Sequence, residues 1–320
     1  MRQREEHWHI MDRQVDQKSP IAASDEVQVD CIWPGPTRLG ECPIWDDRRG
    51  RLLLIDSEGK AIWEMGPKAQ DARVWQVSDV IGSIGLCEDD RLIAGLASGF
   101  AFIDISGAEA KVSHVGNPEP GLPTRLNDGK ADRAGRYWCG SMSLDFKTPV
   151  ASLYRLDPDL RWRRMDTGIT VSNGIAFSRD DRALYFSNSR LDQSFRYDFD
   201  LVTGRISNRR TFVDTTAYDG RIDGACVDTD GNYWGALFEG GAVGCFSPEG
   251  KLLRLVRLPV SCPTMCAFGG PDLATLYVTS ATFAMTPEQL DQEPQAGGLF
   301  AISGLGARGL PEPRFAAGGG

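Results

Sequence analysis

Four side chains with oxygen donors, Glu41, Asn127, Asn173 and Asp223, each lie a few residues ahead of a turn-rich stretch of the chain. Carboxylate and amide oxygens are hard donors, and such donors select hard dications such as Ca²⁺, Mg²⁺ or Mn²⁺. Two carboxylates would neutralise a divalent charge, and a cation that keeps exchangeable waters can activate one of them and polarise a substrate oxygen. The pattern therefore indicates metal-assisted chemistry, provided that the fold brings these residues together.

The stretch RLND at 125–128 adds further polar groups. Arg125 lies two residues before Asn127, on the same face of a strand, so its guanidinium can point at substrate oxygens. We interpret Asp128 as a turn former rather than as a residue that orients a water. A Ser-His-Asp triad or a histidine-built zinc site is not expected, because two of the 3 histidines lie near the N-terminus, which leaves only His114.

A repeated unit explains how distant residues could meet. It consists of a turn followed by a strand rich in β-branched and aromatic residues, and its six copies are WDDRRGRLLLID (45–56), CEDDRLIAGL (87–96), ADRAGRYWCGSM (131–142), SRDDRALYFSNS (178–189), VDTDGNYWGAL (227–237) and GGPDLATLYVTS (269–280). Sheets that cannot bury both faces alone pack radially. We therefore predict an all-β fold, a six-bladed β-propeller with four-stranded blades around a central channel.

Two further elements are expected. The segment 27–33 should complete the last blade beside the C-terminal strands, because this removes an exposed sheet edge. The segment 286–292 should form a short helix with Thr286 as its cap and Pro287 at its first position.

The repeats also place the polar side chains in register. Counting back five residues from the residue that opens each turn gives a polar residue in every unit: Glu41, Ser83, Asn127, Asn173, Asp223 and Thr264. Asn and Asp could simply form turns at such places. Six turns have no need to agree in register, however, whereas a shared pocket does, so we expect these residues to form a ring at one mouth of the channel.

Composition limits the partners. A net charge of -9 without a block rich in Lys and Arg argues against nucleic acid, and no apolar run is long enough for a membrane span. Residues 1–25 read as a polar tail that we expect to be disordered, which leaves 26–320 as one propeller domain. This tail lacks an export signal, so the 8 cysteines are expected to be reduced thiols and the protein cytoplasmic. The oligomeric state is not predictable from these features.

Between residues 37 and 305, a series of stretches resembles the senescence marker protein/gluconolactonase family, the regucalcin-like sugar lactonases. These stretches include LGECPIWDD, RLNDGKADRAGRYWCGSM, VSNGIAFSRDDRALYFSNS and IDGACVDTDGNYWGAL. The resemblance implies a six-bladed propeller that binds one divalent cation at the channel mouth and hydrolyses a sugar lactone to the aldonic acid. It implies Glu41, Asn173 and Asp223 as metal ligands, Asp223 also as the general base, and Arg125 and Asn127 as substrate-binding residues. Ca²⁺ is the first expectation, with Zn²⁺, Mn²⁺, Mg²⁺ and Fe²⁺ as alternatives.

Two departures from the family pattern stand out. Cys42 follows Glu41 where the family usually has Gly or Ser, and we expect its thiol to face the packing between blades. Some family members have a substrate-contacting glutamate after the G-[ST]-M motif, and here the shorter Asp145 lies nearby and is assigned to substrate binding. The identity of the sugar is therefore open.

Two alternative functions remain. Propellers that hold a cation through oxygen ligands also cleave esters and phosphotriesters, so a broader metal-dependent esterase or phosphotriesterase is one alternative. A non-catalytic calcium-binding scaffold is the other. A scaffold has no use for a ring of oxygen donors, and the repeats lack the Gly-His and Trp-Asp marks of interaction propellers.

Overall fold

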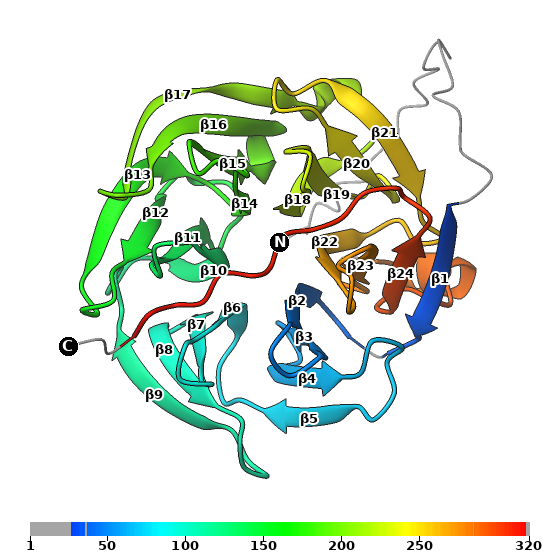
Figure 1. Ribbon diagram of the computed structural model, residues 1–320, viewed down its shortest axis with the longest axis horizontal. Helices are drawn as coiled ribbons and strands as arrows, with labels where there is room; N and C mark the ends of the chain where they lie inside the picture. Colours follow the sequence, from blue (N-terminus) through cyan, green and yellow to red (C-terminus); the bar gives the residue numbers. More distant parts are fainter. Residues whose placement is uncertain (1–26, 36, 284, 318–320) are drawn as a thin grey trace, which may run out of the picture.

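The short apolar runs of the repeated units form strands, and their Asp- and Gly-rich turns reverse the chain between them. The structure is a computed structural model that describes residues 27–35, 37–283 and 285–317; the tail expected over 1–25 lies outside the described residues. In the described residues, 24 strands form six antiparallel sheets of four strands each. The sheets stand around one axis as blades, so the predicted six-bladed propeller is confirmed (Figure 1).

Each blade is a meander that starts at the channel and moves outward. Blades 1 to 3 consist of β2 (Gly40–Asp46), β3 (Arg51–Asp56), β4 (Ala61–Met65) and β5 (Arg73–Gln76); β6 (Ile81–Leu86), β7 (Leu92–Leu96), β8 (Gly99–Asp104) and β9 (Lys111–Gly116); β10 (Thr124–Ala131), β11 (Tyr137–Ser143), β12 (Ala151–Leu156) and β13 (Trp162–Ile169). Blades 4 to 6 consist of β14 (Ser172–Phe177), β15 (Ala183–Asn188), β16 (Gln193–Asp200) and β17 (Arg205–Asp214); β18 (Arg221–Val227), β19 (Tyr233–Phe238), β20 (Ala242–Phe246) and β21 (Leu252–Arg257); β22 (Pro263–Gly269), β23 (Thr275–Ser280), β24 (Leu299–Ser303) and β1 (Gln28–Trp33).

The ring closes where the two ends of the domain meet. Strand β1 pairs antiparallel with β24, with Gln28 opposite Ser303 and Cys31 opposite Phe300. This confirms the position expected for residues 27–33. The pairing gives β24 a second neighbour, so the last blade has the same four strands as the others.

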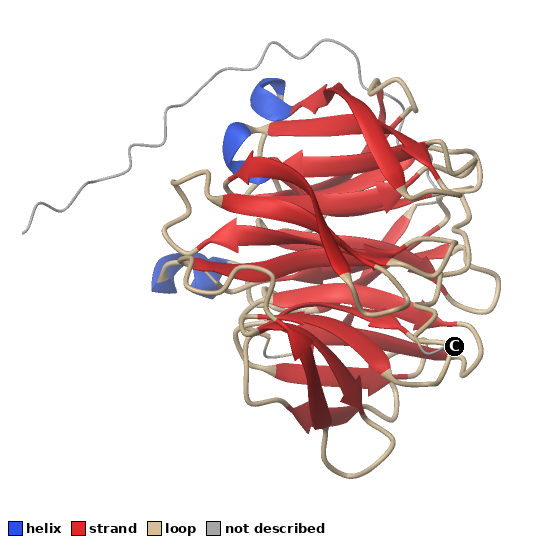
Figure 2. Ribbon diagram, turned by 90° about the vertical axis from the view of Figure 1, so that its left-hand side faces the viewer, coloured by secondary structure: helices blue, strands red, loops and turns tan. Residues whose placement is uncertain are grey.

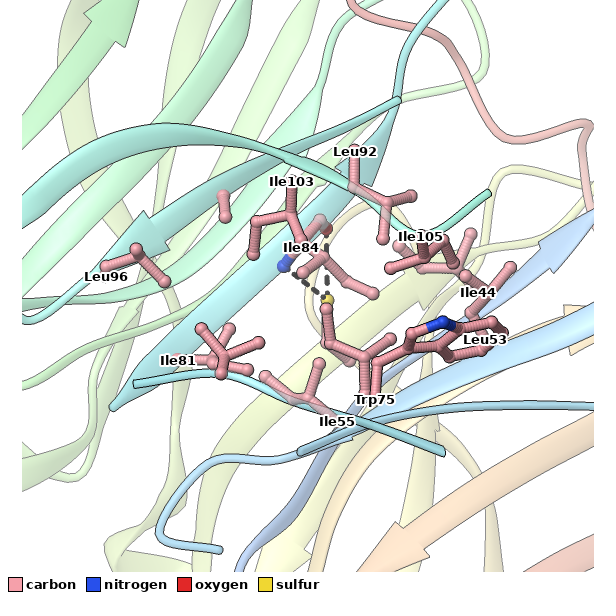
Figure 3. Close-up of a cluster of buried hydrophobic side chains, with 14 of the residues drawn as sticks. Ile44, Leu53, Ile55, Trp75, Ile81, Ile84, Leu92, Leu96, Ile103 and Ile105 are labelled. Carbon is pink, nitrogen blue, oxygen red and sulfur yellow. Dashed lines mark hydrogen bonds between the residues drawn. The ribbon is translucent and has the colours of Figure 1, made fainter. Parts of the chain in front are cut away.

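The hydrophobic core is divided among the interfaces between blades. Each of six clusters of buried side chains draws most of its members from two neighbouring blades. The cluster between blades 1 and 2 includes Ile44, Leu53, Ile84 and Leu92, which interdigitate in Figure 3. Because this packing holds the blades face to face around the channel, it fixes where the innermost strands begin.

Short helices occur on one face of the ring (Figure 2). They are α1 (Pro287–Gln292) and the 3-10 turns η1 (Ser189–Leu191) and η2 (Thr215–Ala217). Helix α1 has Thr286 as its cap and Pro287 at its start, as predicted. No helix in the described part of the chain is long and apolar enough to cross a membrane.

We call the channel opening where the innermost strands begin the front mouth, and the opposite opening the rear mouth. Residues 304–317 cross the ring at the rear mouth (Figure 1, red). Gly309 forms a bridge to Asp228 in blade 5, and Phe315 forms a bridge to Cys87 in blade 2. Because this segment is anchored to blades on both sides of the axis, the rear mouth is covered and the front mouth is the open end.

Candidate metal centre and substrate pocket

The front mouth opens on a cavity of about 570 Å³ that contains the residues expected from the sequence. Glu41 from β2, Asn173 from β14 and Asp223 from β18 line its walls. Arg125 and Asn127 from β10 line it as well. The structure therefore brings together polar side chains from blades 1, 3, 4 and 5.

A shared irregularity in the innermost strands gives these side chains their direction. The pairing of β2 with β3 shifts register between Glu41 and Ile44, and that of β14 with β15 shifts between Asn173 and Ala176. The innermost strands of the other four blades shift at the equivalent place. A bulge disrupts the regular alternation of side chains and re-aims the residues beside it. We attribute the exposure of polar side chains to the channel to this bulge.

Two of the six ring positions do not line the cavity. Ser83 is fully buried, and its hydroxyl donates to the backbone oxygen of Asn127 at 2.7 Å. Thr264 is also fully buried, and its hydroxyl donates to the backbone oxygen of Gly40. The expectation of a six-residue ring is therefore wrong for these two, because their short side chains bond to the next blade before reaching the channel.

A chain of hydrogen bonds orients the amides of the site. Arg125 Nη1 donates to Asn127 Oδ1 at 2.8 Å, and Asn127 Nδ2 donates to Asn173 Oδ1 at 2.9 Å. Asn173 Nδ2 then donates to Ser189 Oγ at 2.9 Å, and Ser189 Oγ donates to the backbone oxygen of Ile222 at 2.8 Å. Because its amide nitrogen is held by Ser189, Asn173 keeps its oxygen on the cavity side. An oxygen acceptor has two lone pairs, so one remains after the bond from Asn127.

The two carboxylates of the site have arginines nearby but form no direct ion pair with them in the described part of the chain. Burial raises the pKa of Glu41 well above its ordinary value, and the negative charges of Asp223 and Asp128 raise it further. Burial also raises the pKa of Asp223 to about 8, with Asp128 as the next cause, whereas Arg221 and Arg125 lower it. In the described part of the chain, neither Glu41 nor Asp223 forms an ion pair. Two like charges, one half-buried and one buried, favour either protons or a bound cation.

These residues fit a divalent cation. Across residues 27–35, 37–283 and 285–317, no group of three or more His, Cys, Asp or Glu side chains is placed to share a metal. A cation at the front mouth would therefore have two charged ligands, Glu41 and Asp223, and one neutral ligand, the oxygen of Asn173. Two carboxylates with neutral oxygen ligands and waters are a donor set that hard dications accept.

Asp128 and Cys42 lie next to site residues but have other environments. Asp128 is a buried residue in the middle of β10, and its carboxylate accepts the backbone N–H of Ile175 at 2.8 Å. Its interpretation as a turn former is therefore wrong. The Cys42 thiol packs in the cluster between blades 1 and 2 and bonds to the backbone of Ile84, as expected, and burial raises its pKa.

Asp145 lines the same cavity, but its carboxylate is engaged in its own loop. It accepts the hydroxyl of Ser143 and the backbone N–H groups of Lys147 and Thr148. The hydroxyl of Thr148, as the largest cause, and these other bonds lower the pKa of Asp145. Whether this residue contacts a substrate stays a prediction.

Sequence reasoning missed several residues of the cavity. Ser189 was not singled out, although it ends the polar run that follows β15. Arg221 and Glu239 form an ion pair in the cavity wall, and Leu144 and Phe146 line the cavity from the loop after β11. The repeat could have pointed to Ser189, because it lies just after the second strand of its blade. Arg221 lies two residues before Asp223, as Arg125 does before Asn127, so the register of the repeat could have pointed to it as well. Glu239, Leu144 and Phe146 lie outside the aligned part of the repeat.

Comparison with known proteins agrees with this architecture. Residues 39–282 match the family model described as the SMP-30/Gluconolactonase/LRE-like region. Regucalcin from Danio rerio is 35% identical over 289 residues, which cover 89% of this chain and 97% of that protein. The solved structure of a calcium-binding protein, regucalcin from Agrobacterium tumefaciens, is similar with a TM-score of 0.84 at 25% identity, over 89% of this chain and 96% of the other.

A luciferin-regenerating enzyme is similar with a TM-score of 0.83 at 29% identity, over 88% of this chain and 96% of the other. The matched family region spans the innermost strands that carry Glu41, Arg125, Asn173 and Asp223. The chain therefore belongs to the SMP-30/gluconolactonase/LRE-like family.

Proposed function

We propose that this protein hydrolyses a sugar lactone to the aldonic acid at the front mouth, and that the reaction depends on one divalent cation. The family includes gluconolactonases by name, which is consistent with lactone hydrolysis. The observation that carries the proposal is the pair of carboxylates in one cavity, half-buried Glu41 and buried Asp223, which have raised pKa values beside the oriented oxygen of Asn173.

Glu41, Asn173 and Asp223 are the residues that would hold the cation, which when bound would polarise the lactone carbonyl. Asp223 accepts a proton from the attacking water, and burial keeps its carboxylate basic enough for this role. Water adds to the carbonyl carbon, the bond from that carbon to the ring oxygen breaks, and the proton passes to the ring oxygen. Orientation of the reactants by the fixed side chains lowers the barrier.

Arg125 is the best placed residue for binding substrate oxygens. Its Nη1 donates to Leu126 and Asn127, and among the described residues its Nε and Nη2 have no hydrogen-bond acceptor, which leaves them for a ligand. Asn127 differs, because both of its N–H groups bond to Ser172 and Asn173. We propose that Asn127 contacts the substrate only through its oxygen and otherwise holds Asn173 in place.

The test is a pH-indicator assay with glucono-δ-lactone, corrected for spontaneous hydrolysis. After chelation, activity should fall to background, and it should return when Ca²⁺, Mg²⁺, Mn²⁺, Zn²⁺ or Fe²⁺ is added back singly. Unchanged turnover in the chelated protein would contradict the metal dependence.

The same assay separates the alternatives. If no cation restores lactone turnover but phenyl acetate or a phosphotriester is cleaved, the broader esterase is the better assignment. If calorimetry detects a cation but nothing is hydrolysed, a calcium-binding scaffold is indicated.

A further inference from the structure

Four large apolar side chains from three blades line the cavity, beside charged residues such as Glu58, Lys147 and Arg190. Leu144 and Phe146 come from the loop after β11, Phe238 ends β19, and Phe283 follows β23. We call these four residues the apolar collar. Leu144 and Phe146 are 54% and 38% exposed, and unlike a scattered surface residue they lie together in a cavity wall. The collar lines the same cavity as Glu41 and Asp223, so a ligand that fills this cavity meets both.

The loop that carries Leu144 and Phe146 is braced in this arrangement. The N–H of Leu144 donates to the backbone oxygen of Pro123 at 2.9 Å, and Arg190 Nε donates to that of Phe146 at 3.1 Å. Asp145 adds the bonds described above. Phe146 also has a φ of 57°, in the left-handed region that a residue with a side chain enters only at a cost of about 1–2 kcal/mol.

Two exposed apolar side chains on a braced loop require an explanation. Covering a Leu or Phe side chain stabilises it by about 1.5–3 kcal/mol, so the loop forgoes that stabilisation in the free protein. Apolar surface gathered at a cavity commonly marks a binding site. A ligand with an apolar part would recover this energy, whereas a lactone with a hydroxyl on each free ring carbon would lose hydration of its hydroxyls against the collar.

The size of the cavity agrees with a larger ligand. A volume of 570 Å³ lies within the range of about 300–1,000 Å³ found for pockets that bind drug-sized ligands. A ligand larger than a hexonolactone therefore fits the size of this cavity.

We infer that the apolar collar binds an alkyl or aryl substituent of the substrate, and that the site prefers lactones carrying such a substituent over polyhydroxylated ones. This inference rests on the proposed lactone hydrolysis. The reaction is unchanged: water adds at the carbonyl carbon, the ring C–O bond breaks, and the product is a hydroxy acid with its apolar chain on the collar. Arg125 would then bind the ring oxygens and the collar the chain.

The test compares kcat/KM for δ-decalactone and glucono-δ-lactone in the full-length protein with its cation. Wild type should favour δ-decalactone. Phe146→Ser and Leu144→Ser should each lower kcat/KM for δ-decalactone about tenfold, mainly through KM, and change it less than twofold for glucono-δ-lactone. Leu160→Ser is the matched control, because Leu160 is 37% exposed, has a φ of 63° and lies in the turn between β12 and β13, outside the cavity.

A binding measurement separates the two proposals. Calorimetry with the corresponding lactam, which is not hydrolysed as readily, should give a negative heat-capacity change that shrinks in Phe146→Ser. Turnover of glucono-δ-lactone without turnover of δ-decalactone would overturn the collar inference and leave the lactonase proposal intact. Binding of the lactam through the collar without turnover of either lactone would support the collar as an apolar binding site and contradict the lactonase proposal.

A second copy of the chain is the other possible occupant. A dimer in sedimentation experiments that dissociates in Leu144→Ser would assign the collar to self-association and overturn the inference.

Discussion

The two mouths of the channel differ in whether their charged side chains form ion pairs. At the rear, Lys130 Nζ lies 3.2 Å from Glu312 Oε1, and Arg314 Nη2 lies 2.6 Å from Asp46 Oδ1. At the front, Glu41 and Asp223 form no ion pair within the described chain. The fold can therefore pair buried charges, and it does so where residues 304–317 cover the channel.

This difference between the mouths indicates which of them is the better candidate for a functional site. A paired buried charge is satisfied by the chain itself, and its role is then structural. An unpaired buried carboxylate remains costly until a proton or a cation neutralises it. The contrast between the mouths supports the assignment of the front mouth as the reactive end.

The largest expected effect concerns the front mouth. Asp223→Asn removes the proposed base and one of the two proposed charged cation ligands, so kcat for glucono-δ-lactone should fall about 10³-fold. The metal-free variant should unfold at the same or a higher temperature, because a buried charge is lost. Asp230→Asn, in the exposed turn after the same strand, should retain wild-type turnover. If Asp223→Asn does not fold, the role of Asp223 is structural, like that of the paired charges at the rear mouth.

The rear mouth should respond in the opposite way. Lys130→Met leaves Glu312 partly buried without its partner, and we expect the free energy of unfolding to fall by about 3–5 kcal/mol in urea titrations. Turnover by the folded protein should persist. The double variant Lys130→Met/Glu312→Leu should recover most of the stability, since no lone charge remains. If Lys130→Met is as stable as wild type, the rear-mouth ion pair does not stabilise the fold, and the proposed difference between the mouths is wrong.

Asp128 lies between the two mouths and sets a pH dependence. Burial raises its pKa to about 6, so the native state holds this proton more tightly than the unfolded chain. The metal-free protein should therefore lose stability as pH rises from about 4 to about 6, and the contribution of this group should be constant above that range. Asp128→Asn keeps an acceptor for the N–H of Ile175 and should be about 2 kcal/mol more stable than wild type at pH 7.

Urea midpoints between pH 4 and pH 8, in the presence of a chelator, measure this effect. Glu41 and Asp223 at the front and Lys130 and Glu312 at the rear also titrate or carry charge nearby, so the difference between variant and wild type is the relevant quantity. Parallel pH profiles for the two proteins would contradict the assignment to Asp128.

The smallest expected effect concerns the support of Asn173 at the front mouth. Ser189→Ala frees the amide nitrogen of Asn173, so its oxygen is no longer held toward the cavity. Affinity for the cation should fall about tenfold by calorimetry, the size expected when a supporting hydrogen bond behind a ligand is lost. Ser194→Ala, which removes a buried bond to Ser187 in the same blade, should leave the affinity unchanged.

The sequence alone was sufficient for the architecture and for part of the site. Six repeated units with period-two strands can bury their faces only against each other, so blade number, ring closure through residues 27–33 and the helix after Thr286 were all predictable. The register of the repeats also selected Glu41, Asn127, Asn173 and Asp223, because equivalent positions in equivalent blades face the same axis.

The tertiary structure determined the environment of each side chain, which the register of the repeats does not specify. Ser83 and Thr264 share that register but bond to the next blade, and Asp128 is buried in a strand instead of forming a turn. The support of Asn173 by Ser189 and the collar residues on variable loops likewise depend on neighbours that no local pattern specifies. Side-chain reach, burial and the presence or absence of an ion pair among the described residues arise only when separate blades meet, and these properties distinguish the open front mouth from the covered rear mouth.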